Sequence, residues 1–524
     1  MKSPALSPER RDAPARGAAS DARTVAKGGG IQVMGQFLNK GLTFAFTAVA
    51  VRVLGTAGFG LYREVFQILT IATMVAGGGF PNGALRFVAR ARALDAHGAV
   101  RGSVRTTAWA TVVSSAIVVT VVLVALDPIA RAFADGNVGE VADMLLLGLA
   151  FVPLYALMQV YRSATQAYKT MVPSVVIGNI VQPLTRMAVG IVVLLLGFGV
   201  AGAISALVLS AALSFLAGVW YFGRLLTPAE RSAPPVSEVG PILRFSFPQA
   251  GVTMLSTSSL GLGIILVGLF ASDEQVGLFG VAQALQLAGN MFLTSIVAIF
   301  SAVAVGLHER GEWGRLESIY QTTNRWVATF GFPVLAALIV MPEFFARLLG
   351  GPDAAGAASI IPLLAIGNLF YVGTGPCGNL LSMTGRPGLN LVNSIVSVAL
   401  YVGLGVWLVP THGIVGMAWV DLAVTALVNI ARVVEIKMIL GVQPFGRSFL
   451  KPVVATAAAG AVLFAWTRVA DASFVASAAG LALFALVYLG VLRLQGIDAE
   501  EREVYDTFKA RLTRRAGKRR TPAE

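Results

Sequence analysis

Long apolar stretches, each bounded by charged residues, glycine or proline, recur along most of this chain and limit its possible folds more than any other feature. A helix needs about twenty apolar residues to cross a bilayer core of roughly 30 Å. Of the 524 residues, 56% are hydrophobic and only 13% are charged, and most stretches lack the polar face that a soluble surface helix requires. We therefore predict an all-α polytopic membrane protein with about fourteen transmembrane helices.

The predicted spans form two sets of six and a final pair. They lie near residues 30–51, 65–87, 105–126, 142–163, 172–196 and 201–223, then 245–270, 278–305, 322–347, 357–383, 388–409 and 413–439, and finally 449–468 and 473–493. The domains are a disordered basic cytoplasmic tail (1–29), an N-lobe (30–224), a cytoplasmic linker (225–244), a C-lobe (245–440), the last two spans (441–494) and a basic cytoplasmic tail (495–524). From Asp498, this last tail is predicted to form an amphipathic helix on the inner leaflet.

An internal repeat relates the two sets of six spans. At an offset of 214 residues, the matching pairs are Pro173 and Pro387, Asn179 and Asn393, Gly199 and Gly413, and Gly202 and Gly416. At an offset of 217 residues, they are Gly60 and Gly277, and Leu61 and Leu278. At an offset of 216 residues, they are Thr106 and Thr322, and Thr107 and Thr323. A near-constant offset in three separate stretches indicates duplication. Because six is an even number, both copies enter the membrane in the same direction, which predicts two parallel lobes with a substrate cleft between them.

Lys and Arg residues alternate between loops and thereby predict the orientation in the membrane, because cytoplasmic loops retain positive charge. With the N-terminus inside, the inner segments hold most of the basic side chains, among them Arg86, Arg90, Arg92, Arg162, Lys169, Arg224, Arg310, Arg432 and Lys451. The outer segments hold few basic residues and carry acidic ones such as Asp127, Glu140 and Asp273. An even number of spans returns the C-terminus to the same side, so both termini are predicted to be cytoplasmic.

Ionisable residues deep in the predicted spans are the strongest candidates for function, since each costs roughly 2.5–3.5 kcal/mol at the centre of a helix. Lys40 lies within the first span, and Gln36 and Asn39 share its helical face. Arg186 lies within the fifth span, one turn after Gln182 and two turns after Asn179. These six residues predict a basic, water-filled cavity that receives an anionic head group.

Three further residues are candidates for a gate or for ion coupling. Asp421 lies within the twelfth predicted span, and Arg63 and Glu64 stand at the outer mouth of the second. An alternative interpretation makes the deep charges structural ion pairs, for instance Arg186 with Asp421. Seven amide side chains of the second lobe, Gln283, Gln286, Asn290, Asn368, Asn379, Asn390 and Asn393, are better explained by hydrogen bonds between helices than by ligand contact.

Several other kinds of site are poor candidates. The single cysteine, Cys377, excludes an internal disulfide, and three histidines without nearby ligands predict no metal site and no cofactor. The net charge of +13 lies in tails and alternate loops, which favours membrane lipids over nucleic acid. A membrane glycosyltransferase, polymerase or ligase would need a large outer loop, whereas the predicted outer loops are short. We therefore expect a protein that is not an enzyme.

Three segments resemble the polysaccharide transporter (Wzx-type flippase) family: VRVLGTAGFGLYREVFQIL, GGGFPNGALRFVARA and SMTGRPGLNLVNSIVSVALYVGLGVWLVPTHGIVGMAW. The resemblance covers about residues 30–440 and rests on loop-and-helix patterns rather than on catalytic residues. This family belongs to the multidrug/oligosaccharidyl-lipid/polysaccharide exporter superfamily, whose fold is two six-helix lobes, often with two added helices. Basic cavity residues are typical of the family, and Lys40 and Arg186 suit that role.

The resemblance implies a flippase of a bacterial cytoplasmic membrane. Its substrate would be a polyprenyl-diphosphate-linked oligosaccharide, moved from the inner to the outer leaflet. Its partners would be membrane lipids and the polysaccharide polymerase and chain-length machinery. Two alternatives stay open. A drug or cation antiporter of the same superfamily would share the fold but would need more carboxylates in its cleft, and a peptidoglycan-precursor flippase is a close relative.

Overall fold

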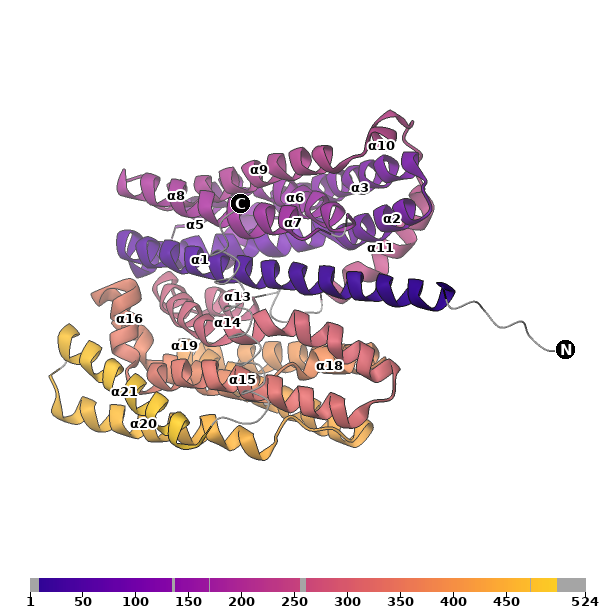
Figure 1. The fold of residues 1–524 in the computed structure, drawn as a ribbon. Helices are drawn as coiled ribbons and strands as arrows, with labels where there is room; N and C mark the ends of the chain where they lie inside the picture. The colour runs from indigo at the N-terminus through magenta and orange to yellow at the C-terminus, as the bar shows by residue number, and fades with distance from the viewer. Residues whose placement is uncertain (1–8, 134–136, 169, 255–260, 472, 497–524) are drawn as a thin grey trace, which may run out of the picture.

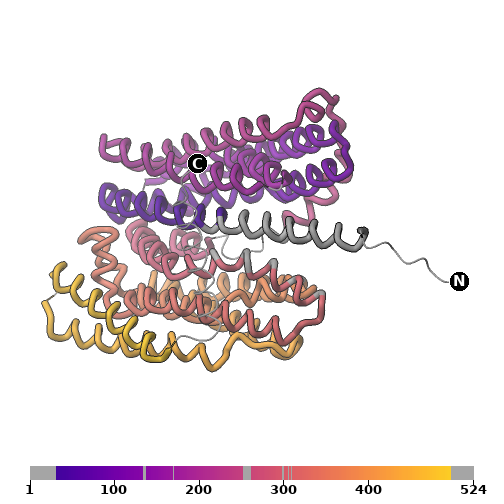
Figure 2. Tube along the Cα trace, in the orientation of Figure 1, coloured from indigo at the N-terminus to yellow at the C-terminus, as the bar shows by residue number. Residues whose placement is uncertain are grey.

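The computed structural model describes residues 9–133, 137–168, 170–254, 261–471 and 473–496, and within these residues the regular secondary structure is entirely helical. Figure 1 shows two bundles of helices side by side, with α1 (Glu9–Gly77) along the boundary between them. In Figure 2 the indigo-to-magenta half of the chain forms one bundle and the pink-to-yellow half forms the other. The two bundles are therefore consecutive in sequence, as the duplication predicts.

The first bundle contains α1, α2 (Phe80–Ala93), α3 (His97–Val124), α4 (Leu126–Phe133), α5 (Val138–Gly148), α6 (Phe151–Gln166), α7 (Val172–Val175), the π-helix η1 (Val176–Val181), α8 (Gln182–Leu195) and α9 (Gly199–Leu225). The connection holds α10 (Pro228–Ser232) and α11 (Val239–Met254). The second bundle contains α13 (Leu262–Phe270), α14 (Asp273–Glu309), α15 (Trp313–Val340), α16 (Pro342–Gly350), η2 (Pro352–Ser359), α17 (Ile361–Thr374), α18 (Cys377–Met383) and α19 (Pro387–Leu440). After η3 (Arg447–Phe449), α20 (Leu450–Val469) and α21 (Phe474–Leu494) lie along its far side (Figure 1).

Ten helices of the described residues are long and apolar enough to span a membrane, or eleven if Pro352–Ser359 and Ile361–Met383, bent by 57°, form one span. Two of the ten, Met34–Ala93 and Gly388–Leu440, contain 60 and 53 residues, so each is long enough for two crossings. The predicted span 245–270 falls on α11, on α13 and on residues 255–260, which lie outside the described residues. The all-α polytopic class is confirmed, but the count of fourteen spans is not.

Two predicted segment boundaries differ from the structure. The tail expected to be disordered through residue 29 is helical from Glu9, because alanine and arginine, both abundant here, are strong helix formers. The linker expected over 225–244 contains α10, and α11 already begins at Val239. The helix predicted from Asp498 lies outside the described residues.

Glycines with positive φ mark the breaks in the long helices. Gly55 (φ 70°) divides α1, and Gly413 (φ 55°) divides α19, because few other residues adopt this backbone conformation without strain. Gly199, which corresponds to Gly413 in the repeat, has a φ of 56° at the start of α9. The two copies of the repeat thus share a backbone feature as well as a sequence pattern.

A close crossing joins the two bundles near the break at Gly55. A Cβ atom added to Gly60 of α1 would lie 1.8 Å from the backbone oxygen of Asp273, and one added to Gly277 of α14 would lie 1.9 Å from that of Thr56. Because Gly277 is the repeat counterpart of Gly60, the contact is reciprocal, as expected across a pseudo-two-fold axis. Nearby, the Arg52 guanidinium donates a 2.5 Å hydrogen bond to the carbonyl oxygen of Leu348.

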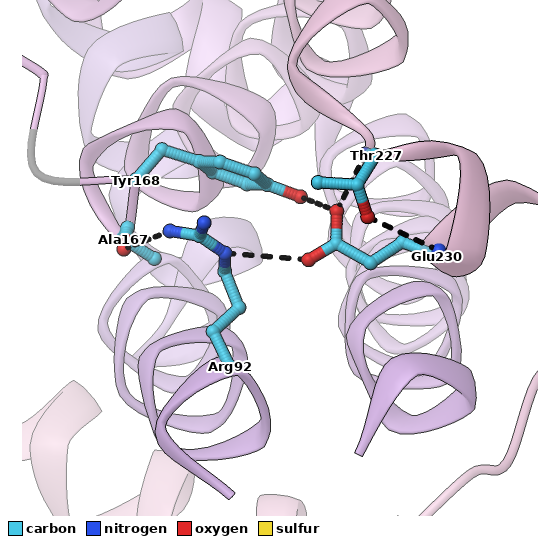
Figure 3. Close-up of polar contacts among 5 residues, drawn as sticks. All are labelled: Arg92, Ala167, Tyr168, Thr227 and Glu230. Atoms are coloured by element: carbon cyan, nitrogen blue, oxygen red, sulfur yellow. Dashed lines mark hydrogen bonds and ion pairs between the residues drawn. The ribbon is translucent and has the colours of Figure 1, made fainter. Parts of the chain in front are cut away.

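At the opposite end of the first bundle, a group of polar side chains hydrogen-bonds to α10 of the connection between the bundles (Figure 3). Glu230 of α10 accepts hydrogen bonds from Arg92 (3.3 Å), from the hydroxyl of Tyr168 (3.0 Å) and from the backbone N–H of Thr227 (2.8 Å). Burial alone would raise the pKa of Glu230, but these hydrogen bonds and the Arg92 charge outweigh it and hold the pKa below its usual value. The Arg92 guanidinium also lies over the Tyr168 ring at 3.9 Å. The group joins the ends of α2, α6 and α9.

Candidate functional site

A polar cavity of about 910 Å³ lies in the second bundle and reaches the boundary with the first. Arg63 and Gln67 of α1 contribute to its wall, and the remaining lining comes from the glycine turn before α13 and from α13, α14 and α17 to α19. Its lining is rich in amides: Gln283, Gln286, Asn290, Asn368, Asn379, Asn390 and Asn429. A chamber with many hydrogen-bonding groups inside a bundle of apolar helices is typical of a site for a polar ligand.

A break between α17 and α18 opens this part of the second bundle. Gly375 (φ 65°) ends α17, and Pro376 precedes α18. The carbonyl groups released by the break are satisfied by side chains of α15, because Tyr320 donates to Thr374 O (2.9 Å) and Asn324 donates to Gly373 O (2.7 Å). Non-helical backbone at membrane depth is stable where it is paired in this way or lines a cavity.

Asp421 of α19 is the acidic side chain in the lining of this cavity. One carboxylate oxygen accepts a 2.6 Å hydrogen bond from Tyr401, and the other accepts a 3.2 Å bond from Gln286. Arg186 instead donates to Thr43 at 3.1 Å. The ion pair between Arg186 and Asp421 that we considered from the sequence is therefore not formed in this structure.

Arg63 and Glu64 face different surroundings although they are adjacent. The Arg63 guanidinium donates a 2.9 Å hydrogen bond to Gln283 of α14, so it links the two bundles at the cavity wall. Glu64 is fully buried, and its carboxylate lies beside Gly268, where an added Cβ would be 2.6 Å from an oxygen. Both residues lie two turns along α1 from the break at Gly55.

The predicted head-group residues, which lie in α1, η1 and α8, are outside the lining of this cavity. Asn39 donates to Gly178 O (3.3 Å) and accepts from Thr43 (3.4 Å), which itself accepts from Arg186. The guanidinium of Arg186 also lies over the rings of Phe46 (5.3 Å) and Phe66 (5.7 Å). Arg186 is thus buried and held by α1.

The other four predicted residues divide into paired and unpaired groups. Asn179 accepts a 3.4 Å hydrogen bond from Arg162, and Gln182 donates a 3.5 Å bond to Ser210, so both are engaged within the first bundle. Gln36 and Lys40 are half-buried on α1. Within the part of the chain that the structure describes, the Lys40 ammonium has no hydrogen-bond or ion-pair partner.

Sequence reasoning missed two basic residues of this region. Arg432 lines the cavity near Gly378, where an added Cβ would lie 3.5 Å from its guanidinium carbon, and Arg162 bonds to Gln159, Ser174 and Asn179. Both had been counted only among the basic residues of the inner segments that predict the orientation. A signal for Arg432 exists, because Asp421, Thr425, Asn429 and Arg432 follow one helical face and all line the cavity.

The fold and the site define a class: a polytopic, all-helical membrane protein of two lobes with a polar chamber in the second lobe. Residues 25–302 match the family described as "Polysaccharide biosynthesis protein", and the chain belongs to this family. A stretch of 232 residues is 25% identical to the teichuronic acid biosynthesis protein TuaB of Bacillus subtilis (strain 168). That alignment spans 42% of this chain and 46% of TuaB, less than half of the relative's length.

Solved structures share the fold. The lipid II flippase MurJ in an inward closed conformation matches with a TM-score of 0.72 at 13% identity, over 88% of this chain and 97% of MurJ. An inward-facing multidrug resistance MATE family transporter of the MOP superfamily matches with a TM-score of 0.63 at 17% identity, over 78% of this chain and 94% of that protein. The predicted two-lobe fold is therefore shared with these structures, which are described as a flippase and a transporter.

Proposed function

We propose that this protein is a flippase that moves a polyprenyl-diphosphate-linked oligosaccharide from the inner to the outer leaflet of a bacterial cytoplasmic membrane by alternating access. The observation that carries the proposal is the amide-rich cavity of about 910 Å³ with Arg63 and Arg432 in its wall. Amides suit a glycan, because they donate and accept hydrogen bonds, whereas guanidinium groups suit a diphosphate. Family membership and the relative named for teichuronic acid biosynthesis support the same substrate class.

The charges give a physical reason for catalysed flipping. Each negative charge that leaves a cell with a negative interior gains about 2.3 kcal/mol per 100 mV, so the obstacle is the loss of head-group hydration. Arg63 and Arg432 would replace hydration of the phosphates inside the cavity, while the lipid tail stays in the bilayer. Lys40, half-buried and without a partner in the described residues, is available to the same head group as the lobes rearrange.

The remaining predicted residues would serve this cycle in other ways. Arg186, Gln36, Asn39, Asn179 and Gln182 would contribute to the head-group path from the first lobe, directly or by holding α1 against α8. We assign Asp421 to a gate or to ion coupling, since its carboxylate lines the cavity and is held by the neutral groups of Tyr401 and Gln286. Arg63 and Glu64 would act at the boundary between the lobes.

The location and the partners form part of the same proposal. The protein would be a multi-pass component of the bacterial inner membrane with both termini in the cytoplasm, since the basic residues gather on that side. A polysaccharide polymerase and chain-length machinery on the outer face would take up the flipped product. Alkaline phosphatase fused after Leu494 would be inactive in this orientation, and an active fusion would contradict it.

The test compares surface polysaccharide and membrane protein level in cells that carry Arg63→Gln, Arg432→Gln, Lys40→Ala or Arg186→Ala as the sole copy. A lost charge-assisted hydrogen bond, about 1.5–3 kcal/mol, predicts a fall of tenfold or more for the first two variants at unchanged protein level. Arg131→Gln, an exposed residue of α4 outside the cavity lining, is the control. Normal polysaccharide in all four variants would remove the head-group hypothesis.

A drug or cation antiporter is the second candidate, and Asp421 is the observation that favours it, because a carboxylate in the cavity would attract a cation. Ethidium efflux by cells that carry the wild-type protein or Asp421→Asn distinguishes the two. Efflux that depends on Asp421, with normal polysaccharide in both strains, would favour the antiporter. A peptidoglycan-precursor flippase would instead be required for cell-wall synthesis when the protein is depleted.

A further inference from the structure

Two apolar grooves on the outside of the first bundle share one ridge of α3. The first groove, about 580 Å³, lies between α3 and α11 and includes Phe80 of α2 in its wall. The second, about 470 Å³, lies between α3, α6 and α9. Arg105 and Trp109 line both grooves, so these two side chains form the ridge between them.

The ridge has the polarity profile of a membrane lipid. Arg105, Trp109, Val113 and Ile117 are spaced four residues apart and therefore follow one face of α3. All four are exposed, and Arg105 has no hydrogen-bond or ion-pair partner among the described residues. Along this face a cation is followed by an interfacial aromatic ring and then by two aliphatic side chains. A phosphate, a glycerol backbone and an acyl chain follow one another in the same order.

From these two features we propose that an anionic phospholipid with two acyl chains binds on this ridge. Its phosphate would contact Arg105, and its chains would occupy the two grooves, one beside Phe247 of α11 and one beside Phe215 of α9. Two grooves on either side of a single cation match one phosphate with two chains. A polyprenyl phosphate has a single chain and would leave one groove unfilled, so the geometry favours the phospholipid.

The site also has a structural consequence. α11 forms one wall of the first groove, and it is the helix through which the chain enters the second half. It already lies close to the N-terminus of α2, since a Cβ added to the N-cap residue Gly79 would lie 2.1 Å from the backbone oxygen of Ser246. A lipid bound between α3 and α11 would also contact α11, on the side that faces the membrane.

The experiment uses the fluorescence of Trp109 in a variant in which the other six tryptophans are replaced by phenylalanine: Trp220, Trp313, Trp326, Trp407, Trp419 and Trp466. The protein is placed in vesicles of brominated phosphatidylcholine, which quenches tryptophan, and unbrominated phosphatidylglycerol is then added in increasing fraction. Preferential binding of phosphatidylglycerol restores fluorescence beyond simple dilution. One basic residue near the bilayer surface predicts about a fivefold preference, equivalent to about 1 kcal/mol.

Arg105→Ala should abolish the preference for phosphatidylglycerol, and Arg105→Lys should keep most of it. The control is Arg131→Ala, which should not change the preference, because Arg131 is exposed and lines neither groove. Equal binding of both lipids to the unaltered ridge, or an unchanged preference in Arg105→Ala, would overturn the proposal. Stronger recovery with undecaprenyl phosphate than with phosphatidylglycerol would overturn the two-chain assignment. If the tryptophan replacements unfold the protein, native mass spectrometry of the wild type and Arg105→Ala from mixed lipids makes the same comparison.

Discussion

The crossing of α1 and α14 at Gly60 and Gly277 makes a quantitative prediction about the movement of the lobes. An ordinary carbon-to-oxygen contact is about 3.3 Å, whereas a Cβ on Gly60 would lie 1.8 Å from the backbone oxygen of Asp273. The Gly60→Ala variant must therefore separate the helices by about 1.5 Å at this point. Overpacking of this kind costs about 1–3 kcal/mol, which shifts a two-state equilibrium by about 5–150-fold. We expect the lobes to open at the Gly55 end.

Spin labels on two exposed residues near this contact, Val53 of α1 and Leu348 of α16, would report the opening as a longer distance in pulsed electron paramagnetic resonance. Because the contact is reciprocal, Gly277→Ala should lengthen the distance to a similar extent. Gly41→Ala in the same helix is the control, since an added Cβ would have no neighbour within 4 Å. Unchanged distances in both interface variants, or an equal change in the control, would refute the reasoning.

Three further predictions concern the stability of the lobes. The pKa of Glu230 is lowered in the folded protein, so the ionised carboxylate adds to the free energy of unfolding above the ordinary glutamate pKa of about 4.3. This stabilisation is lost as pH falls through the lowered value. The thermal unfolding temperature should therefore depend less on acid pH in Glu230→Gln than in the wild type. Arg162→Met removes the donor of three hydrogen bonds, so its apparent unfolding temperature should fall by the equivalent of about 1–3 kcal/mol, and a value equal to the wild type would mean that these bonds contribute nothing. Tyr488→Phe removes the 2.6 Å hydrogen bond from α21 to Thr329 O of α15 and should cost about 1 kcal/mol by the same measurement. Tyr221→Phe is the comparison and should change little, because the half-buried Tyr221 hydroxyl has no hydrogen-bond partner among the described residues.

Hydropathy and the repeat predicted the parts of the fold that depend on short-range properties. Apolar length alone located most spans, because a bilayer imposes one thickness on every helix. The repeat also identified Gly60 and Gly277, and Gly199 and Gly413, as corresponding positions. It could not show that the first pair makes a backbone contact and the second shares a positive φ, because both properties depend on where the helices lie in three dimensions.

The candidate site was harder to predict for the same reason. Sequence position indicated that Lys40, Arg186 and Asp421 are deep, but not which side chains each one faces. The structure places Asp421 in the cavity with Arg63, whereas Arg186 bonds to Thr43 in the first bundle. Arg432 was counted among the basic residues of the inner segments although it lies within the predicted span 413–439, and hydropathy does not show that its side chain lines a cavity.

The duplicated lobes share a sequence repeat but use their polar groups differently. Asn179 accepts a hydrogen bond from Arg162, while its counterpart Asn393 donates one to Glu435 at 2.6 Å. The first lobe satisfies its buried arginine Arg186 with α1, whereas the second keeps an open, amide-lined chamber. The repeat therefore relates the glycines of the two lobes more closely than their polar side chains. Symmetric glycines would govern how the lobes part, and the asymmetric second lobe would govern what enters between them.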